Sequence, residues 1–237
     1  MYLELVNEGQ AATDATPTGG YAVTLTRARF ALSDLEFTAA GLDHASSSSR
    51  RGSFYDWLVP SAFAHPGHTT GGAVIGVLPG RFVFDPFRRR TWGTAELLAG
   101  NYDACNFRWV VATAGDVGPN DPLMGHSAYL EGSAEIDERV LPFVAWVDAA
   151  DSDVVGVPFS ARIAASSTGQ LFFRFAPLDP FEGDSLFAGV PFDRLAPSAD
   201  GIIELAPHAP AGPNREAYDL LKSRLMTPDH FLLEIEE

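Results

Sequence analysis

The sequence has very little cysteine, very little lysine and no long apolar run. Cys105 is the only cysteine among 237 residues, so no disulfide can form within the chain. Its place in an alternating segment predicts a small buried residue, with a cysteine–histidine nucleophile as the alternative. No stretch reaches the roughly 18 consecutive apolar residues of a transmembrane helix, so the sequence predicts no transmembrane segment.

Several catalytic and nucleotide-binding motifs are also missing. The chain contains no GxSxG, no P-loop, no CxxC and no GxGxxG after a strand, so serine-hydrolase and nucleotide-binding functions have no motif behind them. With 31 acidic and 16 basic residues, the net charge is −15. An acidic surface repels phosphate backbones, which argues against nucleic acid as a partner and favours a cation, a basic partner or a neutral ligand. The one basic run, Arg88-Arg89-Arg90, is predicted to be a solvated turn.

Apolar residues, turn residues and alternation are abundant. The chain is 46% hydrophobic, with 17 Phe, 22 Gly and 17 Pro, which is typical of a globular protein built from short strands and many turns. Apolar and polar residues alternate over 21–37, 104–113, 127–136 and 140–147, as in half-buried strands. One helix is predicted over 214–226, with Asn214 as its N-cap. We therefore expect an all-β fold, an antiparallel β-sandwich with one C-terminal helix, forming a single domain over residues 1–237.

Two of the six histidines lie three residues apart in His65-Pro66-Gly67-His68. Proline followed by glycine is typical of a type II turn, whose end residues lie within about 7 Å of each other. Two neutral imidazoles held at the ends of one turn would make half of a metal site. An ordinary surface loop is the alternative.

His126 is the predicted third ligand, because it follows a loop and opens a strand, with Met124 two residues before it. Imidazole with an optional thioether favours copper, although the same three imidazoles also suit zinc. Calcium is the weakest expectation, because it needs six to eight oxygen ligands and neither acidic loop has EF-hand spacing. The two loops contain Asp116, Asn120 and Asp121, and Asp179, Glu182 and Asp184.

Four stretches resemble a known family, in the same order along the chain. They are residues 29–37 (RFALSDLEF), residues 97–107 (LLAGNYDACNF), Asp121 to Met124 together with Tyr129 to Gly132, and the terminal helix with Leu225-Met226 and the closing strand. On these stretches the chain resembles the MbnP-like domain family, whose members are periplasmic β-sandwich proteins associated with copper. The resemblance implies a copper-binding protein that is periplasmic, secreted or anchored at the cell surface, as a lipoprotein for example. A strand pattern, Tyr2-Leu3-Glu4-Leu5, follows Met1 directly, so we also expect the chain to be a mature form from which a targeting segment has been removed.

In some members of that family, a partner di-haem protein oxidises a tryptophan to kynurenine, and the product helps to hold copper. The resemblance therefore also implies a di-haem redox partner. The present chain departs from the pattern, because Trp146 stands where a histidine is expected and no Trp-x-His occurs. Metal binding through imidazoles does not depend on that chemistry.

Three functions follow from these observations. The leading hypothesis is a non-enzymatic metal-binding protein that uses His65, His68, His126 and Met124. The second is a binding or scaffold domain in which the proline-glycine turn is only a rigid loop. The third is a metal-dependent enzyme with an open coordination position, for which the sequence offers no acid or base at a recognisable spacing.

Overall fold

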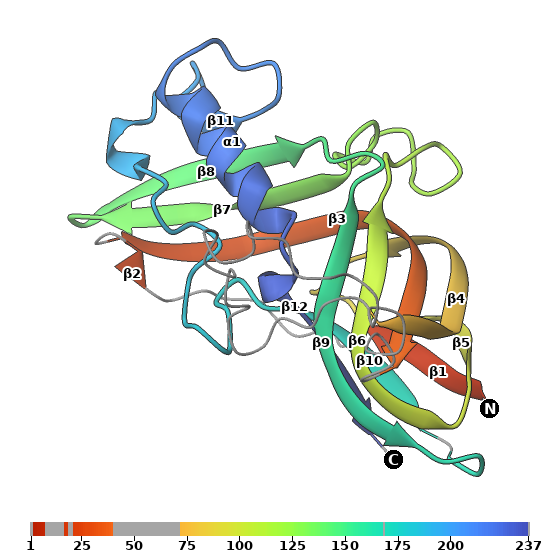
Figure 1. Ribbon diagram of the computed structural model, residues 1–237. Helices are drawn as coiled ribbons and strands as arrows, with labels where there is room; N and C mark the ends of the chain where they lie inside the picture. The colour runs from red at the N-terminus through yellow and green to blue at the C-terminus, as the bar shows by residue number, and fades with distance from the viewer. Residues whose placement is uncertain (1, 8–16, 19–20, 40–71, 168, 237) are drawn as a thin grey trace, which may run out of the picture.

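The computed structural model describes residues 2–7, 17–18, 21–39, 72–167 and 169–236. Within these ranges, twelve strands join in one sheet, and a single α-helix lies near the C-terminus (Figure 1). The strands are β1 (Tyr2–Asn7), β2 (Pro17–Thr18), β3 (Tyr21–Ala39), β4 (Ala73–Phe84), β5 (Arg90–Leu97), β6 (Gly100–Trp109), β7 (Ala128–Ile136), β8 (Arg139–Val147), β9 (Asp153–Ile163), β10 (Gln170–Phe175), β11 (Ile203–Leu205) and β12 (Phe231–Glu236). The helical segments are α1 (Pro213–Leu225) and the 3-10 turns η3 (Phe192–Arg194) and η4 (Pro228–His230). The predicted all-β fold with one C-terminal helix is confirmed, although β1 with β10 and β8 with β11 pair in parallel.

The nineteen-residue strand β3 is the central strand of the sheet. Its first half pairs with β7 and its second half with β6, while β4 pairs along its other edge. The alternation over 21–37 predicts either two strands or one strand with a bulge near Ala28. The chain instead continues as one strand, with register shifts at Leu25 and near Asp34. Asp34 has a positive φ of 52°, and its carboxylate accepts the N–H of Gly80 at 3.2 Å, which explains why 79–80 bends inside β4 and does not end the strand.

The second half of β3 belongs to a strongly curled part of the sheet. From β3 the sheet runs through β4, β5, β1 and β10 to β12 on one side, and through β6 to β9 on the other. Strand β12 then packs beside β9, so the strands enclose a core. Phe107, Phe173 and Phe231 meet there, with ring centroids 5.1–5.8 Å apart. Each is nearly fully buried, and such burial stabilises the fold by about 1.5–3 kcal/mol per side chain.

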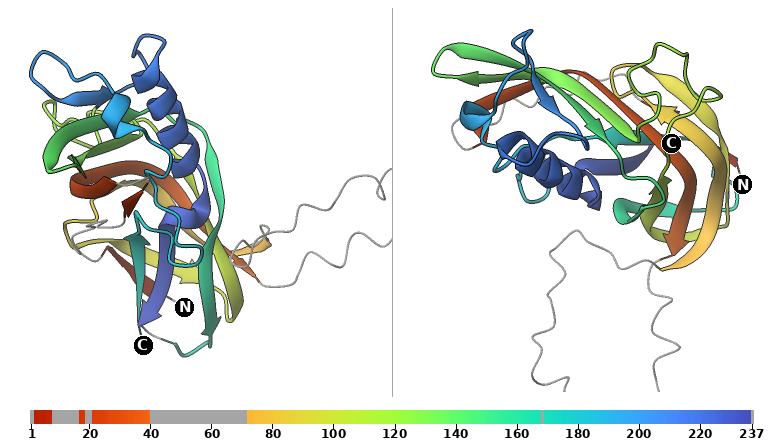
Figure 2. Two further views of the ribbon diagram at one scale, coloured as in Figure 1. Left: turned by 90° about the vertical axis from the view of Figure 1, so that its left-hand side faces the viewer. Right: turned by 90° about the horizontal axis from the view of Figure 1, so that it is seen from above.

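The first half of β3 continues through β7 and β8 to the short edge strand β11. Helix α1 packs against this region through contacts with β8 and β11, as Figures 1 and 2 show. Tyr218 and Leu221 of α1 are buried. The ring of Phe143 in β8 contacts the ring of Phe187, which lies between β10 and η3, with centroids 5.3 Å apart. The predicted N-cap, Asn214, is wrong: Gly212 caps the helix, and Pro213 begins it.

The face of the sheet that points away from α1 is covered by the loop that joins β6 to β7. Its apolar residues form a second cluster with side chains of the strands beneath. This outer cluster consists of Ala31, Val83, Ala112, Val117, Leu123 and Tyr129. Two ion pairs fix the loop to the sheet, Asp116 with Arg81 at 2.7 Å and Asp121 with Arg29. The loop can therefore hold its own His126, two residues before β7, in a defined position.

The predicted turn with His65 and His68 lies outside the described residues. The arginine run is exposed and follows a turn at 86–87, in line with the predicted solvated turn, and its last residue, Arg90, begins β5. In the part of the chain that the structure describes, no helix is both long enough and apolar enough to cross a membrane.

Candidate functional site

His126 lies at the junction between the covering loop and β7. Its N–H donates to the carbonyl of Leu123 at 2.9 Å, and its own carbonyl accepts the N–H of Ala112 at 2.9 Å. The β7–β8 hairpin pairs Ala128 with Val147, which brings the residue after β8, Asp148, next to His126. The hairpin and the loop together fix the backbone on both sides of this imidazole.

The imidazole of His126 is oriented by a carboxylate. Its Nδ1 lies 2.8 Å from Oδ1 of Asp148. An ionised carboxylate only accepts hydrogen bonds, so Nδ1 is the donor of this pair, and Nε2 is the ring nitrogen left for another partner. The two side chains are 27% and 43% exposed, so both are accessible to a solute. A carboxylate on one ring nitrogen is the usual support for a histidine that binds metal through the other.

Helix α1 supports this pair from the other side. The backbone N–H of Asp148 points to the hydroxyl oxygen of Tyr218 at 3.4 Å. Burial raises the pKa of Tyr218, so its hydroxyl stays protonated. Arg215 lies over the Tyr218 ring, 5.3 Å from the centroid. The ring of Trp146 lies 6.4 Å from that of His126, so the site has one aromatic wall.

The other predicted ligands are not assembled around His126 within the described residues. Met124 is partly buried, and its side chain packs against the outer cluster. His65 and His68 lie outside the described residues. In the described ranges, no three His, Cys, Asp or Glu side chains gather closely enough to hold an ion. The described part of the site thus provides one oriented imidazole with its carboxylate.

The carboxylates proposed for calcium bind to the protein itself. Asp116 accepts from the Arg81 guanidinium, which lowers the pKa of Asp116 to about 2. Asp121 pairs with Arg29, so these two carboxylates of one loop face different arginines. In the second loop, Asp179 is buried and accepts the N–H of Phe181 at 2.8 Å. These interactions fix loop conformation and leave fewer oxygens for a cation.

Two further titratable residues are buried and structural. Cys105 is fully buried, as the sequence predicted, and burial raises the pKa of its thiol. A thiol that stays protonated is a poor nucleophile. His230 is also buried, and its Nδ1 lies 3.1 Å from the carbonyl oxygen of Ala176. Burial lowers the pKa of His230, so its ring stays neutral.

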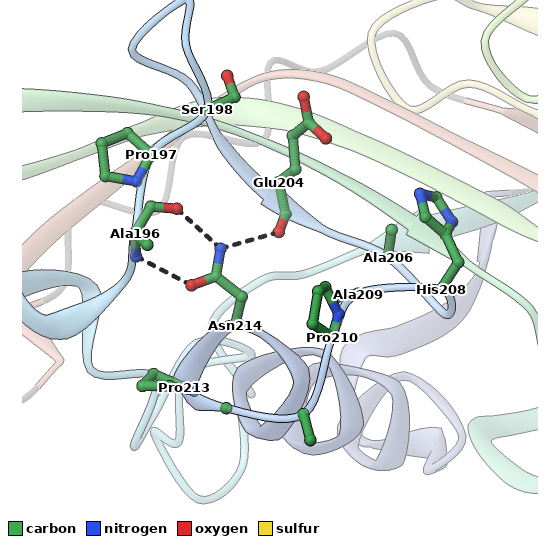
Figure 3. Close-up of a pocket in the computed structure, with 12 residues that line it drawn as sticks. Ala196, Pro197, Ser198, Glu204, Ala206, His208, Ala209, Pro210, Pro213 and Asn214 are labelled. Atoms are coloured by element: carbon green, nitrogen blue, oxygen red, sulfur yellow. Dashed lines mark hydrogen bonds between the residues drawn. The ribbon is translucent and has the colours of Figure 1, made fainter.

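A cavity of about 340 Å³ lies between β11 and the start of α1 (Figure 3). Small apolar residues form most of its wall, with one acidic, one imidazole and one hydroxyl side chain among them. The lining residues are Ala196, Pro197, Ser198, Glu204, Ala206, His208, Ala209, Pro210, Ala211, Gly212, Pro213 and Asn214. We call it the Asn214 pocket.

The amide of Asn214 holds the walls of this pocket together. Its oxygen accepts the N–H of Ala196 at 2.9 Å, and its nitrogen donates to the carbonyls of Ala196 at 2.9 Å and Glu204 at 3.2 Å. Figure 3 shows these bonds joining two chain segments. Sequence analysis missed the pocket, because β11 is only three residues long and was not predicted. The local signal is the run of alanines and prolines before α1.

No family model, curated protein or solved structure matches this chain. The resemblance to the MbnP-like family therefore rests on the four sequence stretches alone. One of them, Tyr129 to Gly132, lies in β7, three residues after His126.

Proposed function

We propose that the protein is an extracytoplasmic metal-binding protein without catalytic activity, that copper is its favoured ion, and that His126 is one ligand. The observation that supports this function is the 2.8 Å pair between Nδ1 of His126 and Asp148. The pair leaves Nε2 as the metal-binding atom and orients the ring before any ion arrives. The net charge of −15 also favours the approach of a cation.

Each residue of the proposed site has a separate role. His126 donates the Nε2 lone pair, and Asp148 orients the ring and increases its basicity. His65 and His68 would supply further imidazoles, and Met124 an optional thioether. The Met124 side chain is flexible enough to turn toward an ion, because its thioether is unbranched. Nitrogen and sulfur donors favour copper over calcium or magnesium, whereas zinc would accept the same imidazoles.

The proposal is tested by copper titration of the full chain after dialysis against a chelator. We expect His126→Ala to weaken copper binding by about tenfold or more, and Asp148→Asn by about 10–100-fold, as for other carboxylates that support a ligand. His208→Ala is the matched control, since it removes an exposed imidazole elsewhere. Nitrogen hyperfine structure in the electron paramagnetic resonance spectrum reports imidazole ligands directly.

Two results would contradict this assignment. If His126→Ala binds copper as tightly as the unaltered protein while remaining folded by circular dichroism, His126 is not a ligand. If His65→Ala and His68→Ala also leave binding unchanged, the metal-binding function itself is wrong. A non-metal binding or scaffold domain would then be the better description.

A further inference from the structure

We propose that the Asn214 pocket binds a small organic amine, an ammonium group attached to a compact apolar body. This inference does not depend on metal binding at His126, because the pocket has its own lining residues. It rests on the shape of the pocket, on its apolar wall and on the sign of its charge.

The pocket has the size and rigidity of a preformed ligand site. Its volume of about 340 Å³ falls within the range of roughly 300–1,000 Å³ that is typical of such sites. Alanine and proline make up most of the wall, and neither loses side-chain rotamer freedom when a ligand binds. The Asn214 amide and the bridge between Pro197 and Ile203 hold two sides of the wall in place. Binding therefore requires little ordering of the protein.

The charge of the pocket favours a cation. Glu204 is the only acidic residue that lines it, and neither lysine nor arginine does. The nearest arginine in sequence, Arg215, pairs with Asp219 at 3.1 Å and donates to the carbonyl of Pro207. An ammonium can donate a charge-assisted hydrogen bond to the Glu204 carboxylate. An anionic ligand would meet neither lysine nor arginine in this wall.

The remaining polar groups limit what else the ligand can carry. Both ends of the Asn214 amide are engaged with backbone groups, so this side chain shapes the pocket and does not recognise the ligand. Figure 3 shows that Glu204 and His208 project from one chain segment on the same side, with the methyl group of Ala206 between them. Ser198 adds one hydroxyl to the lining. A compact hydrocarbon body next to one ammonium group matches this arrangement.

Titration of the isotopically labelled full chain, followed by amide chemical shifts, tests the inference. The probes are cyclohexylamine, cyclohexanol and cyclohexanecarboxylate, which share a ring and differ in charge. We expect the amine to shift amides of residues 196–198 and 204–214, with a dissociation constant on the order of 1 mM. The alcohol should bind at least about fivefold more weakly, the gain expected from one exposed charge pair, and the carboxylate should not bind.

Three variants locate the binding. Glu204→Gln should weaken amine binding about fivefold or more, because it removes the charge and keeps the shape. The matched control Glu216→Gln changes an exposed carboxylate of α1 outside the pocket and should leave the affinity unchanged. Ala209→Leu should weaken binding of both the amine and the alcohol by occupying the cavity.

Equal affinities for the amine and the alcohol would overturn the assignment of a cationic ligand, and so would an unchanged affinity in Glu204→Gln. Shifts confined to other surfaces, an unchanged affinity in Ala209→Leu, or no binding of the amine would overturn the pocket as a ligand site. The copper titration of the same variants keeps the two proposals apart, because loss of amine binding with normal copper binding concerns the pocket alone.

Discussion

Replacing Asn214 with alanine tests how the start of α1 is anchored to the edge of the sheet. The Asn214 amide makes three hydrogen bonds, at 2.9, 2.9 and 3.2 Å, to backbone groups of Ala196 and Glu204. All three hydrogen bonds lie at solvent-exposed positions. Alanine would leave all three groups to water or without a partner.

The loss of stability expected for Asn214→Ala follows from the number and exposure of these hydrogen bonds. A neutral hydrogen bond contributes about 0.5–1.5 kcal/mol net, so three contribute about 1.5–4.5 kcal/mol. Partial exposure brings the sum toward the lower end, since water can replace part of each bond. Alanine has a higher helix propensity than asparagine, which offsets about 0.5 kcal/mol of this loss. We therefore expect the free energy of unfolding to fall by about 2 kcal/mol, or the Tm by about 4–8 °C.

Urea denaturation followed by circular dichroism measures this difference. Ser223→Ala is the matched control, because Ser223 is an exposed residue of the same helix and should change stability by less than about 0.5 kcal/mol. Asn214→Asp keeps the acceptor for the N–H of Ala196 but loses both donated bonds, so it should also destabilise the protein. If Asn214→Ala unfolds within about 0.5 kcal/mol of the unaltered chain, the amide does not anchor the helix.

Three further predictions concern the loop, the core and the long strand. Arg81 lowers the pKa of Asp116 from 3.8 to about 2, so the stabilisation is complete above about pH 4 and is lost as the pH falls toward 2. Because the Arg81 side chain is 42% exposed, we expect about 1 kcal/mol, and Asp116→Asn should flatten that part of the stability profile in acid denaturation. Cys105 should not react with a thiol reagent in the native protein and should react fully in denaturant, and rapid native labelling would contradict its burial. Gly132→Ala would place a Cβ 2.2 Å from the carbonyl oxygen of Thr24 and should cost about 2–3 kcal/mol in thermal or urea unfolding, whereas its control Gly118→Ala, with open space around it, should be nearly neutral.

Much of the strand content could be predicted from the sequence, because alternation is a local signal. The strands β7 and β8 begin and end within a residue of the predicted ranges. Alternation did not predict the structure correctly where a strand is short or bent. Strand β11 has only three residues, too few for a period to be recognised. Pro79-Gly80 is a dipeptide typical of a turn, but pairing with β3 on either side of it keeps the chain in one strand.

In the candidate sites, too, single residues could be selected from the sequence, whereas their partners could not. His126 could be selected from the sequence as a candidate metal ligand, because it is an imidazole between a loop and a predicted strand. Its partner, Asp148, is 22 residues away and comes close only through the β7–β8 hairpin. Asn214 was interpreted as a helix cap, since its neighbours in sequence suit that role. Its actual partners, Ala196 and Glu204, are brought to it by the packing of α1 against β11.

The sequence by itself determined the all-β character, the single late helix, the acidic charge and the burial of Cys105, because each depends on composition or on the pattern of nearby residues. Only the tertiary structure decided that β3 runs unbroken between two different neighbours, that a carboxylate orients His126, and that a pocket forms between β11 and α1. These features depend on contacts between residues far apart in the chain. Their formation is decided by the free energy of packing and pairing summed over the whole fold, which no local pattern records.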